Sequence, residues 1–188
     1  MDKPQKIADY LNQPGSVAVI PTDTLYGLVA RAQDVQATTN LYSLKNRENK
    51  PGTLIASSIQ QLENLGLKHR YLKAVEQFWP GAVSVVIPCA DPKLEYLHLS
   101  KQSLAVRIPN QQNLLELLEL TGPLITSSAN NPGKPPVSTI AQAKQVFGDK
   151  VGMYVDGGDL SQNQPSTVVR VLDDEIEVLR QGAVKINL

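Results

Sequence analysis

The chain has 188 residues, 41% of them hydrophobic, and its 18 basic side chains balance its 18 acidic ones. This length fits one domain around one core, because chains divide into several domains mostly beyond ~250 residues. A formal net charge of zero provides no overall field to attract nucleic acid or an anionic membrane, so any anion site has to be a local cluster of cations. The single cysteine, Cys89, excludes a disulfide within the chain and a zinc site built on paired cysteines.

The histidines and the hydropathy pattern exclude further classes of protein. His69 and His98 lie far apart and outside any recognised motif, which leaves histidine-ligated metals and serine–histidine catalysis without support. The first residues include no apolar segment of signal-peptide length, and no run of about 18 apolar residues occurs anywhere. We therefore expect a soluble, cytoplasmic protein with no membrane partner.

Short apolar runs alternate with amphipathic stretches along the chain. The apolar, often β-branched runs predict strands at residues 17–20, 53–56, 83–87, 104–108, 124–126, 153–155, 167–172 and 175–179. Apolar residues at three- and four-residue spacing predict helices at about residues 7–11, 35–45, 72–79 and 114–120, and after residues 58 and 138. The expected helix-capping residues are Asp34, Ser58, Asn113 and Ser138.

The order of these elements indicates the fold class. Asp173 and Asp174 are expected to turn the last two strands into a hairpin. Helices interleaved with strands, together with such a hairpin, predict one α/β domain over residues 1–188 with a mixed sheet.

Polar segments at the ends of the expected strands are candidate ligand sites, because α/β folds place their ligands in crevices there. In the segment PTDTLYGL, residues 21–28, the hydroxyls of Thr22, Thr24 and Tyr26 suit a small zwitterionic ligand. The alternative is a turn in which Asp23 and the threonines satisfy backbone groups.

Cations form a second group of candidates. Lys45 and Arg47, with Lys50 close behind, can hold phosphate or carboxylate oxygens, although a solvated helix end would have the same composition. Arg107 stands inside an apolar strand, where a cation needs an anionic partner or an exposed edge position. Arg180 alone is also consistent with an ordinary exposed arginine.

The remaining polar segments are less specific. Small hydroxyls and an amide at residues 126–130, followed by glycine and prolines at 133–136, can bind a phosphate, a ribose or a base edge, or can serve as turn and capping residues. The segment at residues 165–169 enters a strand and is weak by itself. The chain contains neither a P-loop nor a GxGxxG turn, so any ATP site must be built differently.

Taken together and in chain order, PTDTLYGL, KNR, WPG, LAVRIP, SSAN, STVV and RQG resemble the YrdC-like family of threonylcarbamoyl-AMP synthases. The resemblance spans about residues 16–182. It implies a twisted α/β domain whose mixed sheet, antiparallel and parallel, is flanked by helices and carries a concave basic groove. It also implies a nucleotidyltransferase that converts L-threonine, bicarbonate and ATP into threonylcarbamoyl-AMP and pyrophosphate. Downstream transfer proteins would use this product for the N6-threonylcarbamoyladenosine modification of tRNA position 37.

The resemblance assigns roles to individual residues. Lys45 and Arg47 are implied to act electrostatically on the reaction, and no general base is assigned. The residues implied to hold ATP, with Mg²⁺ on its triphosphate, are Arg47, Lys50, Ser103, Ser128, Asn130, Pro136 and Arg180. The residues implied to hold threonine are Thr24, Tyr26, Arg107, Thr126 and Ser166. Arg107 would face the threonine carboxylate, and no protein ligand to a metal is expected.

The chain departs from the family pattern after KNR. Glu48 stands where proline is frequent, and residues 51–55 lack a histidine that relatives often have there. Because the chain stops soon after RQG, we expect the short, single-domain form of the family.

Two other functions are left open. A double-stranded RNA-binding module, or weak binding of tRNA, is disfavoured by the zero net charge, because such binding depends on many phosphate contacts. A paralogue of the same fold without synthase activity would typically lack the KxR and SxN motifs, which are present here.

Overall fold

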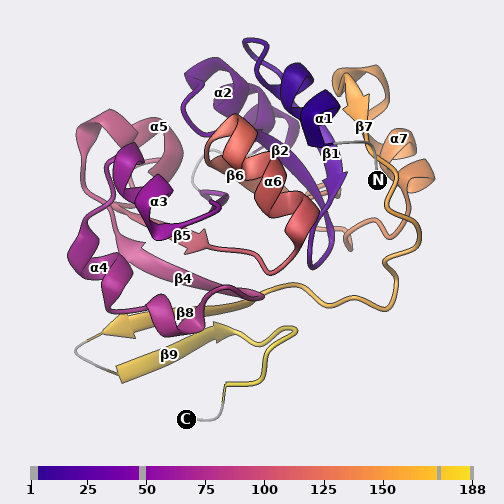
Figure 1. Cartoon of the computed structure of the whole chain (residues 1–188). Helices are drawn as coiled ribbons and strands as arrows, with labels where there is room; N and C mark the ends of the chain where they lie inside the picture. Colours follow the sequence, from indigo (N-terminus) through magenta and orange to yellow (C-terminus); the bar gives the residue numbers. More distant parts are fainter. Residues whose placement is uncertain (1–3, 47–49, 173–174, 187–188) are drawn as a thin grey trace.

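The computed structural model describes residues 4–46, 50–172 and 175–186 (Figure 1). Its strands are β1 (Ala18–Pro21), β2 (Tyr26–Arg31), β3 (Thr53–Ile55), β4 (Val83–Pro88), β5 (Ser103–Arg107), β6 (Leu124–Ser128), β7 (Met153–Tyr154), β8 (Thr167–Leu172) and β9 (Glu175–Arg180). The α-helices are α1 (Pro4–Leu11), α2 (Val35–Leu44), α3 (Ile59–Leu65), α4 (His69–Lys73), α5 (Glu95–His98), α6 (Gln112–Thr121) and α7 (Ile140–Phe147). Short 3₁₀ helices span Glu76–Phe78, Pro92–Leu94 and Gly148–Lys150.

The described strands form one mixed sheet in the order β7-β1-β2-β6-β3-β5-β4-β8-β9. The pairs β1–β7, β3–β5 and β4–β8 are parallel, and the other neighbouring pairs are antiparallel. The expected α/β class with a mixed sheet flanked by helices is confirmed.

Helices cover both faces of this sheet. On one face, α1 and α6 pack on residues such as Val29, Ile55 and Leu124. On the other face, side chains from α2, α3, α5 and α7 join a larger core that includes Leu28, Leu54 and Ile125. Successive strand residues point to opposite faces, which is why neighbours in sequence such as Leu54 and Ile55 belong to different cores.

The helix-capping residues predicted from the sequence are correct for two helices and wrong for two others. Asp34 and Ser58 cap α2 and α3 through side-chain oxygens, as predicted. The N-cap of α6 is Gln111 and not Asn113, and that of α7 is Thr139 and not Ser138.

Two larger elements also differ from the prediction. The helix expected at residues 72–79 is divided into α4 and a 3₁₀ turn, with Val75 between them in a non-helical conformation. The strand β2 was not predicted, because the polar residues 22–25 led the whole segment to be interpreted as a loop. The expected turn at Asp173 and Asp174 lies outside the described residues, but the strands on either side of it do pair as an antiparallel hairpin.

Within the described ranges, no helix has both the length and the apolar character needed to cross a membrane.

Asp34 should stabilise the fold in a pH-dependent manner. Its carboxylate accepts hydrogen bonds from the backbone amides of Ala37 and Gly15, at 2.9 and 2.8 Å. Burial opposes ionisation, but these amides outweigh it and hold the pKa of Asp34 below its usual value. Such a carboxylate stabilises the folded state above its usual pKa, and this contribution is lost as pH falls through the lowered pKa.

We therefore expect Asp34→Ala to lower the free energy of unfolding by about 1–2 kcal/mol near neutral pH. The deficit should begin to shrink near pH 4, where the carboxylate of the unfolded chain becomes protonated, and should be lost as pH falls through the lowered pKa of the folded state. Urea unfolding at a series of pH values measures this, with the exposed Asp9→Ala on α1 as the matched control. A deficit that stays constant down to acid pH would contradict the assignment.

Candidate functional site

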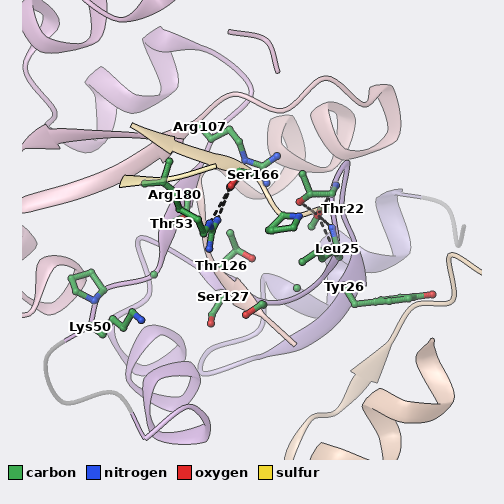
Figure 2. A pocket seen from close by; sticks show the side chains of 17 residues that line it. Thr22, Leu25, Tyr26, Lys50, Thr53, Arg107, Thr126, Ser127, Ser166 and Arg180 are labelled. Carbon is green, nitrogen blue, oxygen red and sulfur yellow. Dashed lines mark hydrogen bonds between the residues drawn. The ribbon is translucent and has the colours of Figure 1, made fainter. Parts of the chain in front are cut away.

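A polar cavity of about 260 Å³ lies on the sheet face that also carries α1 and α6 (Figure 2). The strand registers pair Thr53 with Thr126 and Ile55 with Arg107. Thr53, Arg107 and Thr126 therefore share a face with Ile55, which packs beneath those helices. The cavity thus continues the buried face of the sheet into a region lined by polar groups.

Most of the residues predicted for the site are brought together in this cavity. All members of the threonine-binding set line it: Thr24, Tyr26, Arg107, Thr126 and Ser166. From the ATP-binding set, Lys50, Ser128 and Arg180 line it as well. Other lining residues had no individual role predicted from the sequence, although all but Thr53 lie in the candidate polar segments: Leu25, Gly27, Thr53, Ser127 and Val168.

Other predicted residues lie elsewhere. Ser103 and Pro136 are not among the lining residues, and the Ser103 hydroxyl donates to the Lys101 carbonyl at 3.3 Å. Arg47 lies outside the described residues. Figure 2 shows the side chain of Tyr26 extending away from the cavity, where its hydroxyl donates to Gly158 O and accepts from Gly157 N, both at 2.8 Å.

The turn between β1 and β2 fixes the direction of its hydroxyl groups. Thr22 Oγ1 donates to the Leu25 carbonyl at 2.7 Å and accepts from the amides of Thr24 and Leu25 at 3.2 Å. Because the single proton of Thr22 is used in this way, the 3.0 Å contact between the two threonine hydroxyls has Thr24 as its donor. Thr24 Oγ1 is therefore left with lone pairs that can accept from an N–H group in the cavity.

Arg107 is the most buried cation of the cavity wall. Its Nη1 forms an ion pair with Asp23 Oδ1, and the two side chains are only 4% and 7% exposed. Its Nε is buried without a hydrogen-bond partner. The sequence predicted either an anionic partner or an exposed edge position for a cation in this strand. The structure provides an anionic partner, Asp23, which no sequence signal linked to Arg107.

A second guanidinium reaches the cavity from the end of β9. Arg180 donates from Nη2 to Ser166 O at 2.8 Å and to Ser166 Oγ at 3.3 Å. The Ser166 hydroxyl also lies 3.0 Å from the buried hydroxyl of Ser84. Loss of hydration, and then repulsion by Arg107, lowers the pKa of Arg180. An anion bound between the two guanidiniums would relieve that repulsion.

Lys45 connects α2 to the loop that follows β6. Its Nζ donates to Ser128 O at 3.0 Å, to Asn130 O at 2.6 Å and to Asn130 Oδ1 at 2.7 Å. Ser128 Oγ donates to the same Asn130 Oδ1 at 2.7 Å. Lys45, Ser128 and Asn130, which belong to the predicted KxR and SxN pair of motifs, thus form one network, in which Lys45 is buried behind the cavity wall.

Close backbone approaches shape the cavity around Thr126. A Cβ atom on Gly27 would lie 2.7 Å from Thr126 Oγ1, and one on Gly52 would lie 2.6 Å from Thr126 O. Real Cβ atoms essentially never approach so closely, so only glycine fits at either position without a shift. Gly27 therefore leaves room for the Thr126 hydroxyl, and Gly52 leaves room for the Thr126 carbonyl.

Gly182 also allows a close backbone approach, near the lining residues Pro165 and Ser166. A Cβ atom on Gly182, just after Arg180, would lie 2.2 Å from Pro165 O. The buried Thr167 hydroxyl accepts from the amides of Gly182 and Val184, at 3.0 and 3.2 Å, and donates to Val184 O at 2.6 Å. These contacts hold the segment after β9 against Ser166.

Among the described residues, no cluster of three or more His, Cys, Asp or Glu side chains could hold a metal ion. The lining residues include three cations, Lys50, Arg107 and Arg180, and no carboxylate. The described wall of the cavity is therefore suited to anionic ligands.

Comparison with known proteins identifies the family of the chain. The family model Sua5_yciO_yrdC, described as telomere recombination, matches residues 10–182. The chain belongs to this family. A protein of Mycobacterium tuberculosis (strain CDC 1551 / Oshkosh) is 36% identical over 174 residues, which cover 90% of this chain and 80% of the relative.

Two further proteins are similar to this chain. Threonylcarbamoyl-AMP synthase of Klebsiella pneumoniae (strain ATCC 700721 / MGH 78578) is 34% identical over 172 residues, covering 88% of this chain and 89% of the relative. The crystal structure of P. abyssi Sua5 complexed with L-threonine superposes with a TM-score of 0.83 and 28% identity. It covers 95% of this chain, which in turn spans 54% of that longer protein.

The Thr167 hydroxyl provides a test of how the Arg180 side of the cavity is held. Thr167→Val keeps the shape of the side chain but removes the acceptor for the amides of Gly182 and Val184. We expect these two amides to exchange with deuterium about ten-fold faster or more, since an intramolecular hydrogen bond contributes roughly 1 kcal/mol.

Hydrogen exchange followed by NMR measures this directly. Thr39→Val is the matched control, because the exposed Thr39 hydroxyl donates to Val35 O within a helix far along the chain from residues 182–184. Unchanged protection of Gly182 and Val184 in Thr167→Val would show that the hydroxyl does not hold this segment.

Proposed function

We propose that this chain is an L-threonylcarbamoyladenylate synthase, a nucleotidyltransferase that joins L-threonine, bicarbonate and the AMP portion of ATP and releases pyrophosphate. The observation that carries the proposal is the cavity with two guanidiniums, Arg107 and Arg180, among hydroxyl groups and without a lining carboxylate. The named relatives support the same activity.

The cavity supplies complementary groups for a bound amino acid. Arg107 would hold the threonine carboxylate, since a guanidinium fork matches carboxylate geometry. Thr24 Oγ1, whose own proton goes to Thr22, would accept from the amine. Thr126 and Ser166 line the same cavity and would hold the remaining polar atoms of the substrate.

The size of the cavity suggests how ATP is placed. Pockets for drug-sized ligands typically measure ~300–1,000 Å³, and this one measures about 260 Å³. It would hold threonine and the reacting phosphates, with the adenosine reaching outside it. Arg180 and Lys50 would contact phosphate oxygens. Ser103, Asn130 and Pro136, which do not line the cavity, remain proposed ATP contacts, as does Arg47, which lies outside the described residues.

In the proposed reaction, the threonine amine captures bicarbonate or carbon dioxide and forms a carbamate, with loss of water in the case of bicarbonate. A carbamate oxygen then attacks the α-phosphorus, the bond from that phosphorus to the bridging oxygen breaks, and pyrophosphate leaves. Positioning and charge stabilisation dominate such a phosphoryl transfer, so no general base is required of the protein in this step.

The cations have distinct proposed roles. Arg47 and Lys50 would stabilise charge on the phosphates, and Mg²⁺ would arrive with ATP as part of the substrate. Lys45 would act through Ser128 and Asn130, whose loop its ammonium group holds. Burial of Lys45 behind the wall favours this positioning role over direct contact with phosphate.

The product would pass in the cytoplasm to proteins that transfer the threonylcarbamoyl group to adenosine 37 of tRNA. No observation favours a double-stranded RNA-binding module instead. A paralogue without synthase activity is disfavoured by the joined network of Lys45, Ser128 and Asn130.

Pyrophosphate release by the purified protein tests the proposal. Release should require threonine, bicarbonate and Mg·ATP together, because the carbamate is the nucleophile. Omission of any one should reduce the rate to background, and serine should serve as the comparison amino acid. Equal release with and without threonine would reject the proposed specificity.

A further inference from the structure

The turn between β1 and β2 contains a carboxylate that the proposed chemistry does not use. Asp23 is not among the residues that line the substrate cavity. It lies behind Arg107, in the wall of a neighbouring hollow lined also by Gln111, Asn113 and Asp156. Its side chain is nevertheless nearly as buried as that of Arg107.

We propose that Asp23 is the positioning residue that aims the Arg107 guanidinium at the substrate carboxylate. This inference rests on the proposed function, since it concerns the same amino-acid site. Asp23 would not touch the substrate, and its effect would pass through Arg107 alone.

The contacts of Asp23 fix both partners. Oδ1 of Asp23 accepts a hydrogen bond from Nη1 of Arg107, and Oδ2 accepts one from the backbone amide of Asn110 at 3.4 Å. Asn110 lies just before α6, so the carboxylate joins the β1–β2 turn, the end of β5 and the approach to α6. With one end of the guanidinium held in this way, the rest of the group keeps a defined orientation beside the cavity.

The charges explain why a carboxylate is needed at this position. Loss of hydration lowers the pKa of Arg180, and repulsion by Arg107 lowers it further, so the two guanidiniums are close enough to interact. Without Asp23, two guanidiniums would face one cavity with no anion among its described lining residues. Arg107 would then be expected to turn toward other acceptors, because the guanidinium remains charged even when buried.

Asp23→Asn tests this inference. The amide keeps the size of the side chain but loses its charge. The KM for threonine should rise by about tenfold or more, while the KM for ATP and kcat at saturating threonine stay within about threefold of wild type. Calorimetric titration of threonine without ATP should show a similar loss of affinity.

Two further variants complete the design. Asp23→Glu retains the charge but shifts it by one methylene, so the KM for threonine should rise less than in Asp23→Asn. If the amide variant fails to fold, Asp23→Glu carries the test by itself: its KM for threonine should rise above wild type while its KM for ATP does not, and equal increases in both would overturn the inference. Glu177→Gln is the matched control, because Glu177 forms an exposed ion pair with Arg170. It should leave both KM values unchanged.

The outcomes separate this inference from the proposed function. Wild-type protein without threonine-dependent pyrophosphate release would reject the function. Active Asp23→Asn with a wild-type KM for threonine, or with equal increases in both KM values, would overturn the positioning role. A threonine-specific increase in Asp23→Asn that is smaller in Asp23→Glu supports it.

Discussion

A guanidinium buried in a sheet needs an anionic partner, and the pairing of Arg107 with Asp23 is the interaction on which the arrangement of the site depends. Breaking a buried ion pair by removing one partner typically costs about 3–5 kcal/mol, because the remaining charge stays desolvated. The pair ties the turn at residues 22–25 to the end of β5 across the sheet. The hydroxyl of Thr24 is placed at the cavity by that same turn.

Glycines and buried hydroxyls complete the frame around this pair. Gly27 and Gly52 allow the backbone to approach Thr126 from two sides, and Gly182 lies directly against the Pro165 carbonyl. The Thr167 hydroxyl accepts hydrogen bonds from two backbone amides of the segment that follows Arg180. The shape of the cavity therefore depends on backbone approaches and buried hydrogen bonds as well as on the polar side chains that line it.

The fold class and most of the polar residues that line the cavity could be predicted from the sequence, because both leave patterns in short segments of the chain. Apolar runs indicated eight of the strands, and the helix caps at Asp34 and Ser58 could be identified from residue type and spacing. Polar segments at strand ends marked residues 21–28, 126–130 and 165–169 as candidates, and the family resemblance assigned Thr24, Thr126 and Ser166 within them to the site. Strand β2 was missed because its apolar residues follow directly on the polar turn.

Long-range geometry was not accessible from these patterns. Asp23 and Arg107 are 84 positions apart, and no spacing rule joins them. The direction of the Tyr26 hydroxyl depends on the backbone of Gly157 and Gly158, more than a hundred residues further along. The contacts of Lys45 with Ser128 and Asn130, more than 80 residues further along the chain, likewise depend on the three-dimensional fold.

Binding of L-threoninol, compared with L-threonine, tests the central claim most directly. Threoninol keeps the amine, the hydroxyl and the methyl group but has an alcohol in place of the carboxylate. If Arg107, held by Asp23, recognises that carboxylate, calorimetric titration should show threoninol binding at least about tenfold more weakly, a difference of ~1.4 kcal/mol. Equal affinity of the two ligands would contradict the account.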